Sequence, residues 1–318
     1  MNRRSFLKLS MLTALGAMST ACSLKKAPAV RIAAHTWPGY EFIYLARSLG
    51  ILDPELVKLI ETPNATTNIR ALGAEMAEGA MLTLDEVITA REGGIDLSIV
   101  TILNVSMGAD ALLVRPNIRH LSEIRGLRIG VEHTATGAVM LDAALKAAGL
   151  QATDIQLVYL SIDEHKEAFE NGSIDAVVTY EPVKTLLINQ GMKSIFSSRE
   201  TPGNIIDVLA FRSDILESHE IAIQHAVDSH FIALASWKEN PEIHSAYLSR
   251  QLGVKETELM SLYDDLELPD KSYNTSWLVG SQAKLLQSAQ NLGIIMLDSG
   301  LLSRTPKFDR LFDSRFII

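Results

Sequence analysis

The hydrophobic and polar positions near the start of the chain predict a strand, a tight turn and a helix. A mostly apolar run, Val30–Ala34, precedes Trp37-Pro38-Gly39-Tyr40, whose proline and glycine are typical of a turn. Apolar residues then recur with the i, i+3, i+4, i+7 spacing of an amphipathic helix, at Phe42, Leu45, Ala46 and Leu49. Gly50 follows and indicates where this helix ends.

The same alternation of apolar strands and amphipathic helices continues to about residue 211. Further strands are expected at 80–82, 97–103, 109–114, 127–131, 155–160, 174–178, 194–196 and 207–211, and helices at 66–78, 84–91, 138–148, 163–171 and 181–190. Such alternation favours mostly parallel sheets with helices on both faces. From Glu220 onward the pattern is helical, with long helices expected at 221–240 and 276–292.

Two similar openings divide the chain into two expected lobes. The strand at 127–131 is followed by a turn, a helix and Gly149, which repeats the arrangement at the start. A chain of 318 residues also exceeds what one hydrophobic core usually supports. We therefore expect an α/β protein with lobe one at residues 30–115 and 208–318, lobe two at 116–207, and a ligand cleft between them. Hinges are expected near Arg115-Pro116 and in the segment 207–210.

The first 22 residues have the features of an export signal. Arg3, Arg4 and Lys8 precede a short apolar run, and small residues then lead to Ala21-Cys22. This order predicts a signal peptide over residues 1–22 that is too short to span a membrane. The paired arginines favour twin-arginine export, with general secretion as the alternative.

Ala21-Cys22 resembles a lipobox, so we expect Cys22 to be lipidated. Residues 23–29 would then form a leash, and the rest of the chain would lie in the periplasm, held to a membrane by its lipid anchor only. Cys22 is the sole cysteine, so the chain cannot form an internal disulfide.

Four segments in order carry a family resemblance. They are the opening at 30–52, Leu82-Thr-Leu-Asp-Glu-Val87, Ile174-Asp-Ala-Val-Val-Thr-Tyr-Glu-Pro182 and the tail at 300–313. Together they resemble the nitrate/sulfonate/taurine-type substrate-binding proteins of ABC importers, a group that includes thiamine-precursor-synthesis-like proteins. The resemblance implies a two-lobed type II periplasmic-binding-protein fold. It also implies a lipoprotein that captures a small polar organic solute and delivers it to an ABC permease and its ATPase.

Candidate ligand-binding residues follow the predicted strands, because ligands of open α/β sheets bind at the carboxyl ends of strands. The candidates are His35, Trp37, Tyr40, Thr83, Asp85, Thr134, Thr136, Tyr180, Glu181 and Asp207. The resemblance adds that Tyr180, Glu181 and Asp207 match family patterns. For Trp37 the alternative is a side chain that fills the gap between turn and helix. For Thr134 and Thr136 the alternatives are helix capping and binding of an anionic group, which are compatible.

The net charge and the positions of acidic residues limit the kinds of partner that we expect. The formal net charge of −9 disfavours nucleic acids and anionic membrane surfaces. Acidic residues fall at several expected cleft positions, namely Asp85, Glu86, Glu132, Glu181 and Asp207. Such a cleft favours a solute with an amine or many hydrogen-bond donors over nitrate or a bare sulfonate.

The sequence has no catalytic signature that we can identify. Metal-ligand spacings, a dinucleotide fingerprint and a nucleophile elbow are absent, so we expect no cofactor and no enzymatic activity, and a monomeric protein. Related thiamine-pyrimidine synthases use a cysteine-rich motif that this chain lacks. A second function stays open, in which the lipoprotein senses a solute and presents its closed state to a membrane signalling receptor.

Overall fold

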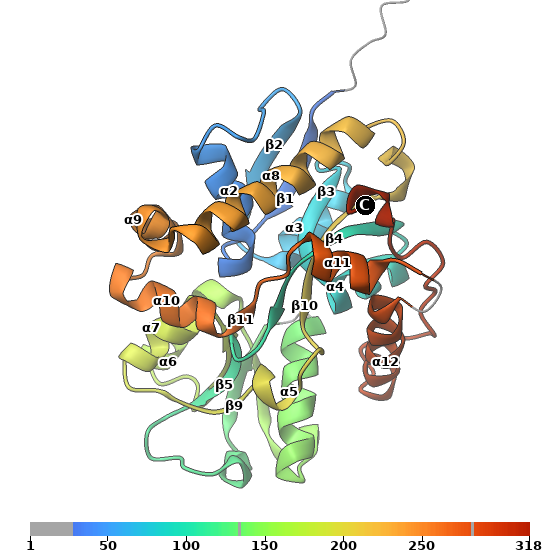
Figure 1. The fold of residues 1–318 in the computed structure, drawn as a ribbon. Helices are drawn as coiled ribbons and strands as arrows, with labels where there is room; N and C mark the ends of the chain where they lie inside the picture. The colour runs from blue at the N-terminus through green and yellow to red at the C-terminus, as the bar shows by residue number, and fades with distance from the viewer. Residues whose placement is uncertain (1–27, 133–134, 281–282) are drawn as a thin grey trace, which may run out of the picture.

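Two β-sheets organise the computed structural model, which describes residues 28–132, 135–280 and 283–318 (Figure 1). The first sheet has the order β11-β4-β10-β3-β1-β2. Its strands are β1 (Val30–Ala34), β2 (Val57–Glu61), β3 (Gly79–Thr83), β4 (Leu97–Ser106), β10 (Ile206–Arg212) and β11 (Leu266–Glu267). The second sheet has the order β7-β6-β8-β5-β9. Its strands are β5 (Asp110–Val114), β6 (Arg128–Val131), β7 (Gln156–Tyr159), β8 (Ala176–Tyr180) and β9 (Lys193–Ser197).

In each sheet most strands share one direction, and the strand that arrives from the other sheet runs against them, as does the short β11. β1 pairs in parallel with β2 and β3, and β6 pairs in parallel with β7 and β8. β10 lies antiparallel to β3 and β4, and β5 lies antiparallel to β8 and β9. These two reversed strands are the ones that arrive from the other sheet, since β5 follows β4 and β10 follows β9. Most strands of each sheet thus run in one direction, as expected, and the antiparallel pairs made by β5, β10 and β11 make both sheets mixed.

The first passage between the sheets lies earlier than the expected boundary at residue 115. Strand β5 pairs only with β8 and β9, so the chain changes sheet between Ser106 and Asp110. The expected boundary followed the end of an apolar run at Arg115-Pro116, and an apolar run does not reveal which sheet it joins. The second passage lies between Ser197 and Ile206, next to the expected boundary at residue 207.

Helices cover both faces of each sheet, as the sequence predicted (Figure 1). Near the first sheet lie α2 (Glu41–Ser48), α3 (Ala65–Gly73), α4 (Leu84–Glu92), α8 (Glu220–Glu239), α9 (Pro241–Leu252), α10 (Glu256–Asp264), α11 (Lys271–Leu278) and α12 (Lys284–Asp298). Near the second lie α5 (Ala135–Ala148), α6 (His165–Glu170) and α7 (Val183–Asn189). Along β5, Leu112 and Val114 enter one core cluster while Ala111 and Leu113 enter another, which is the alternation expected of a strand covered on both faces.

Several elements differ from the sequence prediction, among them the short β11 in a region expected to be helical. The single helix expected at 276–292 is divided into α11 and α12, and Gly280 between them has a φ of +102°, which ends a helix. Strand β2 was not predicted, because it is a half-exposed edge strand whose Lys58 and Glu61 interrupt the apolar run.

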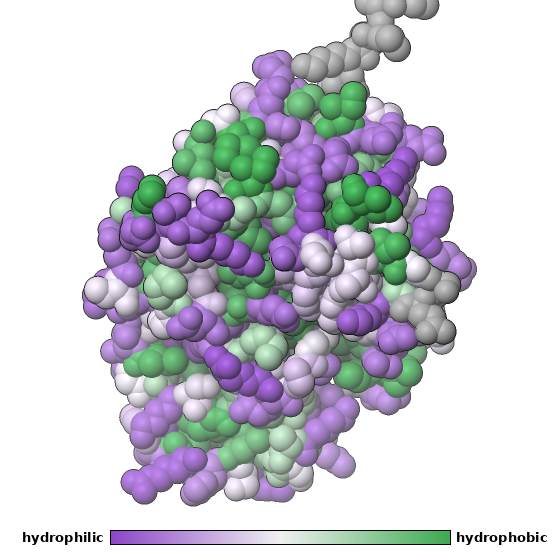
Figure 2. Space-filling model, in the orientation of Figure 1, coloured by the Kyte–Doolittle hydropathy of each residue, from purple (hydrophilic) through white to green (hydrophobic). Residues whose placement is uncertain are grey.

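The surface carries small, separate apolar groups among polar ones on the face drawn in Figure 2. Within the described ranges, we find no helix with the length and apolar character that crossing a membrane requires.

A buried asparagine completes the outer edge of β4. β11 pairs only with Val105 and Ser106, so the backbone of Ile102 has no strand on that side. The Asn274 side chain of α11 takes this place: its Oδ1 accepts from the N–H of Ile102 at 2.7 Å, and its Nδ2 donates to the carbonyl of Ile102 at 3.1 Å. The Thr101 hydroxyl donates to the same Oδ1 at 3.0 Å. This contact docks the C-terminal helices on the first sheet.

We predict that Asn274→Ala destabilises the protein strongly. The substitution leaves buried N–H, C=O and hydroxyl groups without partners, which costs about 2–4 kcal/mol of unfolding free energy in total. Urea unfolding followed by circular dichroism measures this loss. The control Asn291→Ala, at an exposed position of α12, should cost under about 0.5 kcal/mol. Equal effects of the two substitutions would contradict the docking role.

Candidate functional site

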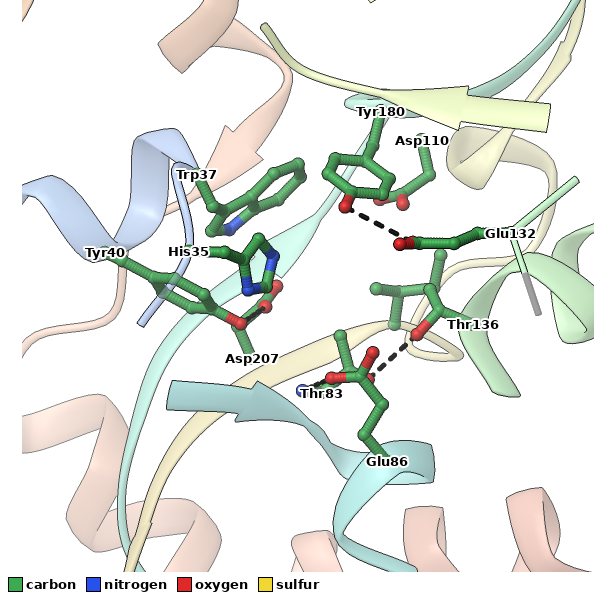
Figure 3. A pocket seen from close by; sticks show the side chains of 11 residues that line it. His35, Trp37, Tyr40, Thr83, Glu86, Asp110, Glu132, Thr136, Tyr180 and Asp207 are labelled. Carbon is green, nitrogen blue, oxygen red and sulfur yellow. Dashed lines mark hydrogen bonds between the residues drawn. The ribbon is translucent and has the colours of Figure 1, made fainter. Parts of the chain in front are cut away.

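A small cavity lies between the two sheets and receives side chains from both (Figure 3). The described residues that line it are His35, Trp37, Tyr40, Thr83, Glu86, Asp110, Glu132, Thr136, Tyr180, Ile205 and Asp207. Its free volume is about 20 Å³, which is room for a water molecule. A larger molecule therefore enters only if the lobes separate or side chains move.

The turn after β1 builds the first wall. Pro38–Tyr40 forms a short 3₁₀ helix, and the backbone of Gly39 lies against Asn104, where an added Cβ would come within 1.9 Å of the amide nitrogen. Only glycine fits there. The close approach lets the Trp37 Nε1–H donate to Asn104 Oδ1 at 3.2 Å. The Tyr40 hydroxyl donates to Asp207 Oδ1 at 2.6 Å, which ties this turn to β10.

Four rings lie in edge-to-face contact around the cavity (Figure 3). The ring centroids of Trp37 and Tyr180 are 5.7 Å apart, those of His35 and Tyr40 5.4 Å, and those of His35 and Tyr180 6.1 Å. The contacts to Tyr180 join the two lobes. Trp37 is only 3% exposed, belongs to the first hydrophobic core and also lines the cavity, a position that is compatible with both interpretations of this residue.

Threonines connect the lobes on the opposite side. Thr83 and Glu86 form a capping box at the start of α4, in which Glu86 Oε2 accepts from the Thr83 N–H at 2.9 Å. The Thr136 hydroxyl of α5 donates to Asp85 Oδ2 at 2.9 Å and lies 2.9 Å from the Thr83 hydroxyl. Because Thr136 has one proton to donate, Thr83 is the donor in their contact.

The cavity concentrates buried carboxyl groups. Burial raises the pKa of Glu86 to about 8, and the Asp85 charge adds to this rise. Burial likewise raises the pKa of Asp110 and of Glu132 to about 7. Burial, together with the charges of Asp110 and Glu86, raises the pKa of Asp207 well above its ordinary range, despite the hydrogen bond from Tyr40. The folded protein therefore binds protons here that an exposed carboxyl would have lost.

His35 adds no positive charge to this group. Its Nδ1 lies 3.2 Å from Asn68 Nδ2, which is a donor, so Nδ1 accepts and the ring proton is on Nε2. Burial lowers the pKa of His35 to about 4, so the ring is neutral at pH 7.

Most of the predicted site residues meet at this cavity. His35, Trp37, Tyr40, Thr83, Thr136, Tyr180 and Asp207 line it. Asp85 lies directly behind, bonded to Thr136. Thr134 and Cys22 lie outside the described residues.

Glu181 does not line the cavity. It accepts from the N–H and hydroxyl of Thr185 at 3.1 and 3.0 Å and pairs with Lys184 at 3.1 Å. Lys184 in turn pairs with Asp265 of the first lobe, which also pairs with Arg199. Glu181 thus belongs to a group of charges that joins the lobes beside the cavity.

Four residues that line the cavity were not among the site candidates: Glu86, Asp110, Glu132 and Ile205. Glu86 and Glu132 were predicted only as acidic cleft positions. Asp110 and Ile205 lie where the chain passes between the sheets, and the early placement of the first passage explains why Asp110 was missed. Among the described residues, no group of His, Cys, Asp and Glu has the geometry of a metal site.

The chain belongs to the NMT1-like family, whose model matches residues 26–250. It is 27% identical over 199 residues to a protein of Escherichia coli (strain K12) named for binding aliphatic sulfonates, a match that covers 59% of this chain and 60% of that protein. It is also 24% identical over 236 residues to the taurine-binding periplasmic protein of the same organism, covering 70% of this chain and 73% of the relative. The first match thus spans less than two thirds of the relative's length.

Solved structures share the fold. The periplasmic aliphatic sulphonate binding protein SsuA from Escherichia coli superposes with a TM-score of 0.73 at 21% identity, covering 89% of this chain and 91% of that one. The alkanesulfonate-binding protein SsuA from Xanthomonas axonopodis pv. citri, bound to MOPS, superposes with a TM-score of 0.76 at 15% identity. This match covers 91% of this chain and 99% of that one. The two-lobed periplasmic-binding-protein fold is confirmed.

We predict that the protein loses stability between about pH 6.5 and 8.5. An unfolded chain has ionised its carboxyls above their ordinary pKa of about 4, whereas Glu86, Asp110 and Glu132 keep protons to pH 7–8 when folded. A raised pKa gives stability that is fully present below the ordinary pKa and is lost as pH rises from there to the folded pKa, at about 1.4 kcal/mol per pH unit for each such group, and the loss ends just above the folded pKa. His35 affects the pH dependence of stability only below about pH 6.5, because its pKa is lowered in the folded protein. There the unfolded chain binds a proton that the buried ring does not, so stability falls on acidification.

Thermal unfolding across this pH range measures the effect. Glu86→Gln should flatten the curve, whereas Glu242→Gln, at an exposed position of α9, should leave it unchanged. A flat curve for the unmodified protein would show that these carboxyls are hydrated in solution, as they would be with the lobes apart.

Proposed function

We propose that this chain is an extracytoplasmic solute-binding protein that captures a small polar organic solute and delivers it to an ABC permease and its ATPase. The observation that carries the proposal is the cavity itself, which is lined by polar and aromatic side chains and built from residues of both lobes. The names of the two relatives as sulfonate-binding and taurine-binding proteins support it. Under this proposal the protein is a binding protein and has no catalytic activity of its own.

Binding would couple to closure of the lobes. Contacts that exist only when the lobes are together, such as Thr83 with Thr136 and Lys184 with Asp265, stabilise the closed form. A solute that touches both walls adds to them and shifts the population toward closure. A permease that contacts both lobes then distinguishes loaded from empty protein by differential affinity. The hinges would lie at the two passages between the sheets.

We further propose export to the periplasm by the signal peptide at residues 1–22 and anchoring by lipid on Cys22. The relative named as a periplasmic protein supports this location. Strand β1 starts at Val30, eight positions after Cys22, so a short segment of chain would join the anchor to the folded part.

A thermal-shift screen of the purified protein tests solute binding. The compounds are sulfonates, nitrate, bicarbonate, pyrimidines, amino acids and polyamines. A ligand present at about 100 times its Kd adds roughly 2.7 kcal/mol of stability, which raises Tm measurably. The shift should disappear in Tyr180→Ala, which removes a cavity wall, and persist in Tyr159→Ala, an exposed tyrosine of β7.

Uptake of the hit by cells with and without this chain then tests delivery. Loss of uptake in its absence supports the importer. Unchanged uptake despite tight binding would contradict delivery and favour the solute-sensing alternative. No hit from any class, with protein freed of co-purified ligand, would contradict a cleft for these solutes.

Substitution Cys22→Ser tests the anchor. We expect the unmodified protein in the membrane fraction with an acyl mass on its mature N-terminus, because acyl chains supply the membrane affinity. The variant should be released from the periplasm without detergent. Lys26→Gln should stay anchored as the control. An unacylated mature N-terminus in the unmodified protein would contradict lipidation.

A further inference from the structure

The described lining of the cavity contains four carboxyl groups and no lysine or arginine. Glu86 and Asp207 come from the first lobe, and Asp110 and Glu132 from the second. His35 is neutral at pH 7 because its pKa is lowered to about 4. The ammonium group of Lys184, near this region, forms ion pairs with Glu181 and Asp265. An anionic group in the cavity would therefore meet no described side-chain cation.

Two of these carboxyls have buried oxygens without partners. Asp110 is 4% exposed and Asp207 is 2% exposed, yet Asp110 Oδ2 and Asp207 Oδ2 have no hydrogen-bond donor. A buried acceptor without a donor is costly, and the cost is greatest when the acceptor is charged. Both residues line the cavity, so a ligand placed there can supply the missing N–H groups.

Aromatic rings form the rest of the enclosure. Trp37, Tyr40 and Tyr180 surround the space beside the carboxyls (Figure 3). Tryptophan and tyrosine rings attract cations through their π faces and also pack against apolar carbon. Carboxylates with aromatic rings are a combination that suits an organic ammonium better than an inorganic ion.

We propose that the solute is an organic cation, with an ammonium or protonated ring nitrogen among the carboxyls and its carbon frame against Trp37 and Tyr180. This inference rests on the proposed function and specifies its solute. It separates this chain from the ligand classes in the names of its relatives, because the described lining offers a bare sulfonate no lysine or arginine, and its carboxyls become negatively charged acceptors when they ionise. A sulfonate that also carries an amine satisfies only part of the site.

Binding of an organic cation should be coupled to the release of protons from the carboxyls. A cation interacts best with ionised carboxylates, and burial raises the pKa of Glu86 to about 8 and that of Asp110 to about 7. The groups that face them are Asp85, Glu132, Asp207, Tyr40, Tyr180, His35, Glu181 and Lys184. Cation binding therefore displaces protons, and affinity should increase as pH rises from about 6 to 8.5, where the free carboxyls ionise.

Calorimetric titration with shape-matched compounds of different charge tests the class. One set is benzylamine, benzyl alcohol and phenylmethanesulfonate, and a second is ethylamine, taurine and ethanesulfonate. We expect the amine of at least one set to bind at least about thirtyfold more tightly than its sulfonate, as charge-assisted contacts require. Titration of the amine in two buffers of different ionisation enthalpy should show proton release.

Two variants assign the effect to the cavity. Asp110→Asn and Asp207→Asn keep the shape and one oxygen acceptor, and each should weaken the amine about tenfold while changing benzyl alcohol less than threefold. Glu242→Gln removes the same charge from the surface of α9 and should leave amine affinity unchanged. This comparison separates a local contact from the net charge of the protein.

The outcomes separate the two proposals. Tighter binding of a sulfonate than of its matched amine, or amine affinity that is independent of pH and of both aspartates, overturns the cation class and leaves solute binding intact. Failure of every compound here and in the wider screen overturns the cation class and the proposed function together.

Discussion

The two segments that carry the chain between the sheets are bonded to each other, and the position of the site depends on this contact. The buried hydroxyls of Ser106 and Ser198 lie 2.8 Å apart, and Ser198 Oγ also accepts from the Gly108 N–H at 2.7 Å. The Ser106 N–H donates to the carbonyl of Ile205 at 3.1 Å. This pairing joins the last residue of β4 to the residue that precedes β10. Asp110 and Asp207, from opposite lobes, therefore face one cavity.

Buried charge is the second constraint on the site. Folding moves several carboxyls into a small space with few donors, and the pKa values of these groups rise because burial disfavours their ionised forms. Three events relieve this cost: proton binding, separation of the lobes with hydration of the groups, and binding of a ligand with donors. Because all three act on the same carboxyls, they are thermodynamically linked. Closure, protonation and solute binding in this protein should therefore be treated as one equilibrium.

The sequence pattern was sufficient to predict the frame of the protein, meaning its two sheets and the helices that cover them, and the residues that follow the strands. Trp37-Pro38-Gly39-Tyr40 is a turn in both the prediction and the structure, and the capping box of Thr83 and Glu86 follows from their spacing. The contact of Trp37 with Asn104 was not predictable, because it joins residues 67 positions apart through a tertiary approach at Gly39. Glu181 had the expected position at the end of β8, but its side chain turns to Lys184 instead of the cavity. The position of a strand follows from the local sequence, whereas the direction of a side chain depends on the tertiary partners that it contacts.

The separation of frame from lining explains how one fold serves different solutes. The first core extends through β1, β3, β4 and β10, and apart from Trp37 and Tyr40 its buried residues do not line the cavity. The lining comes instead from strand ends, helix starts and the two passages, where a substitution changes the cavity chemistry with little effect on the sheets. Similarity to a solved structure at 21% identity shows the fold alone and leaves the ligand open. In this chain the lining residues Glu86, Asp110 and Asp207 make the site acidic, and the solute must be inferred from those groups.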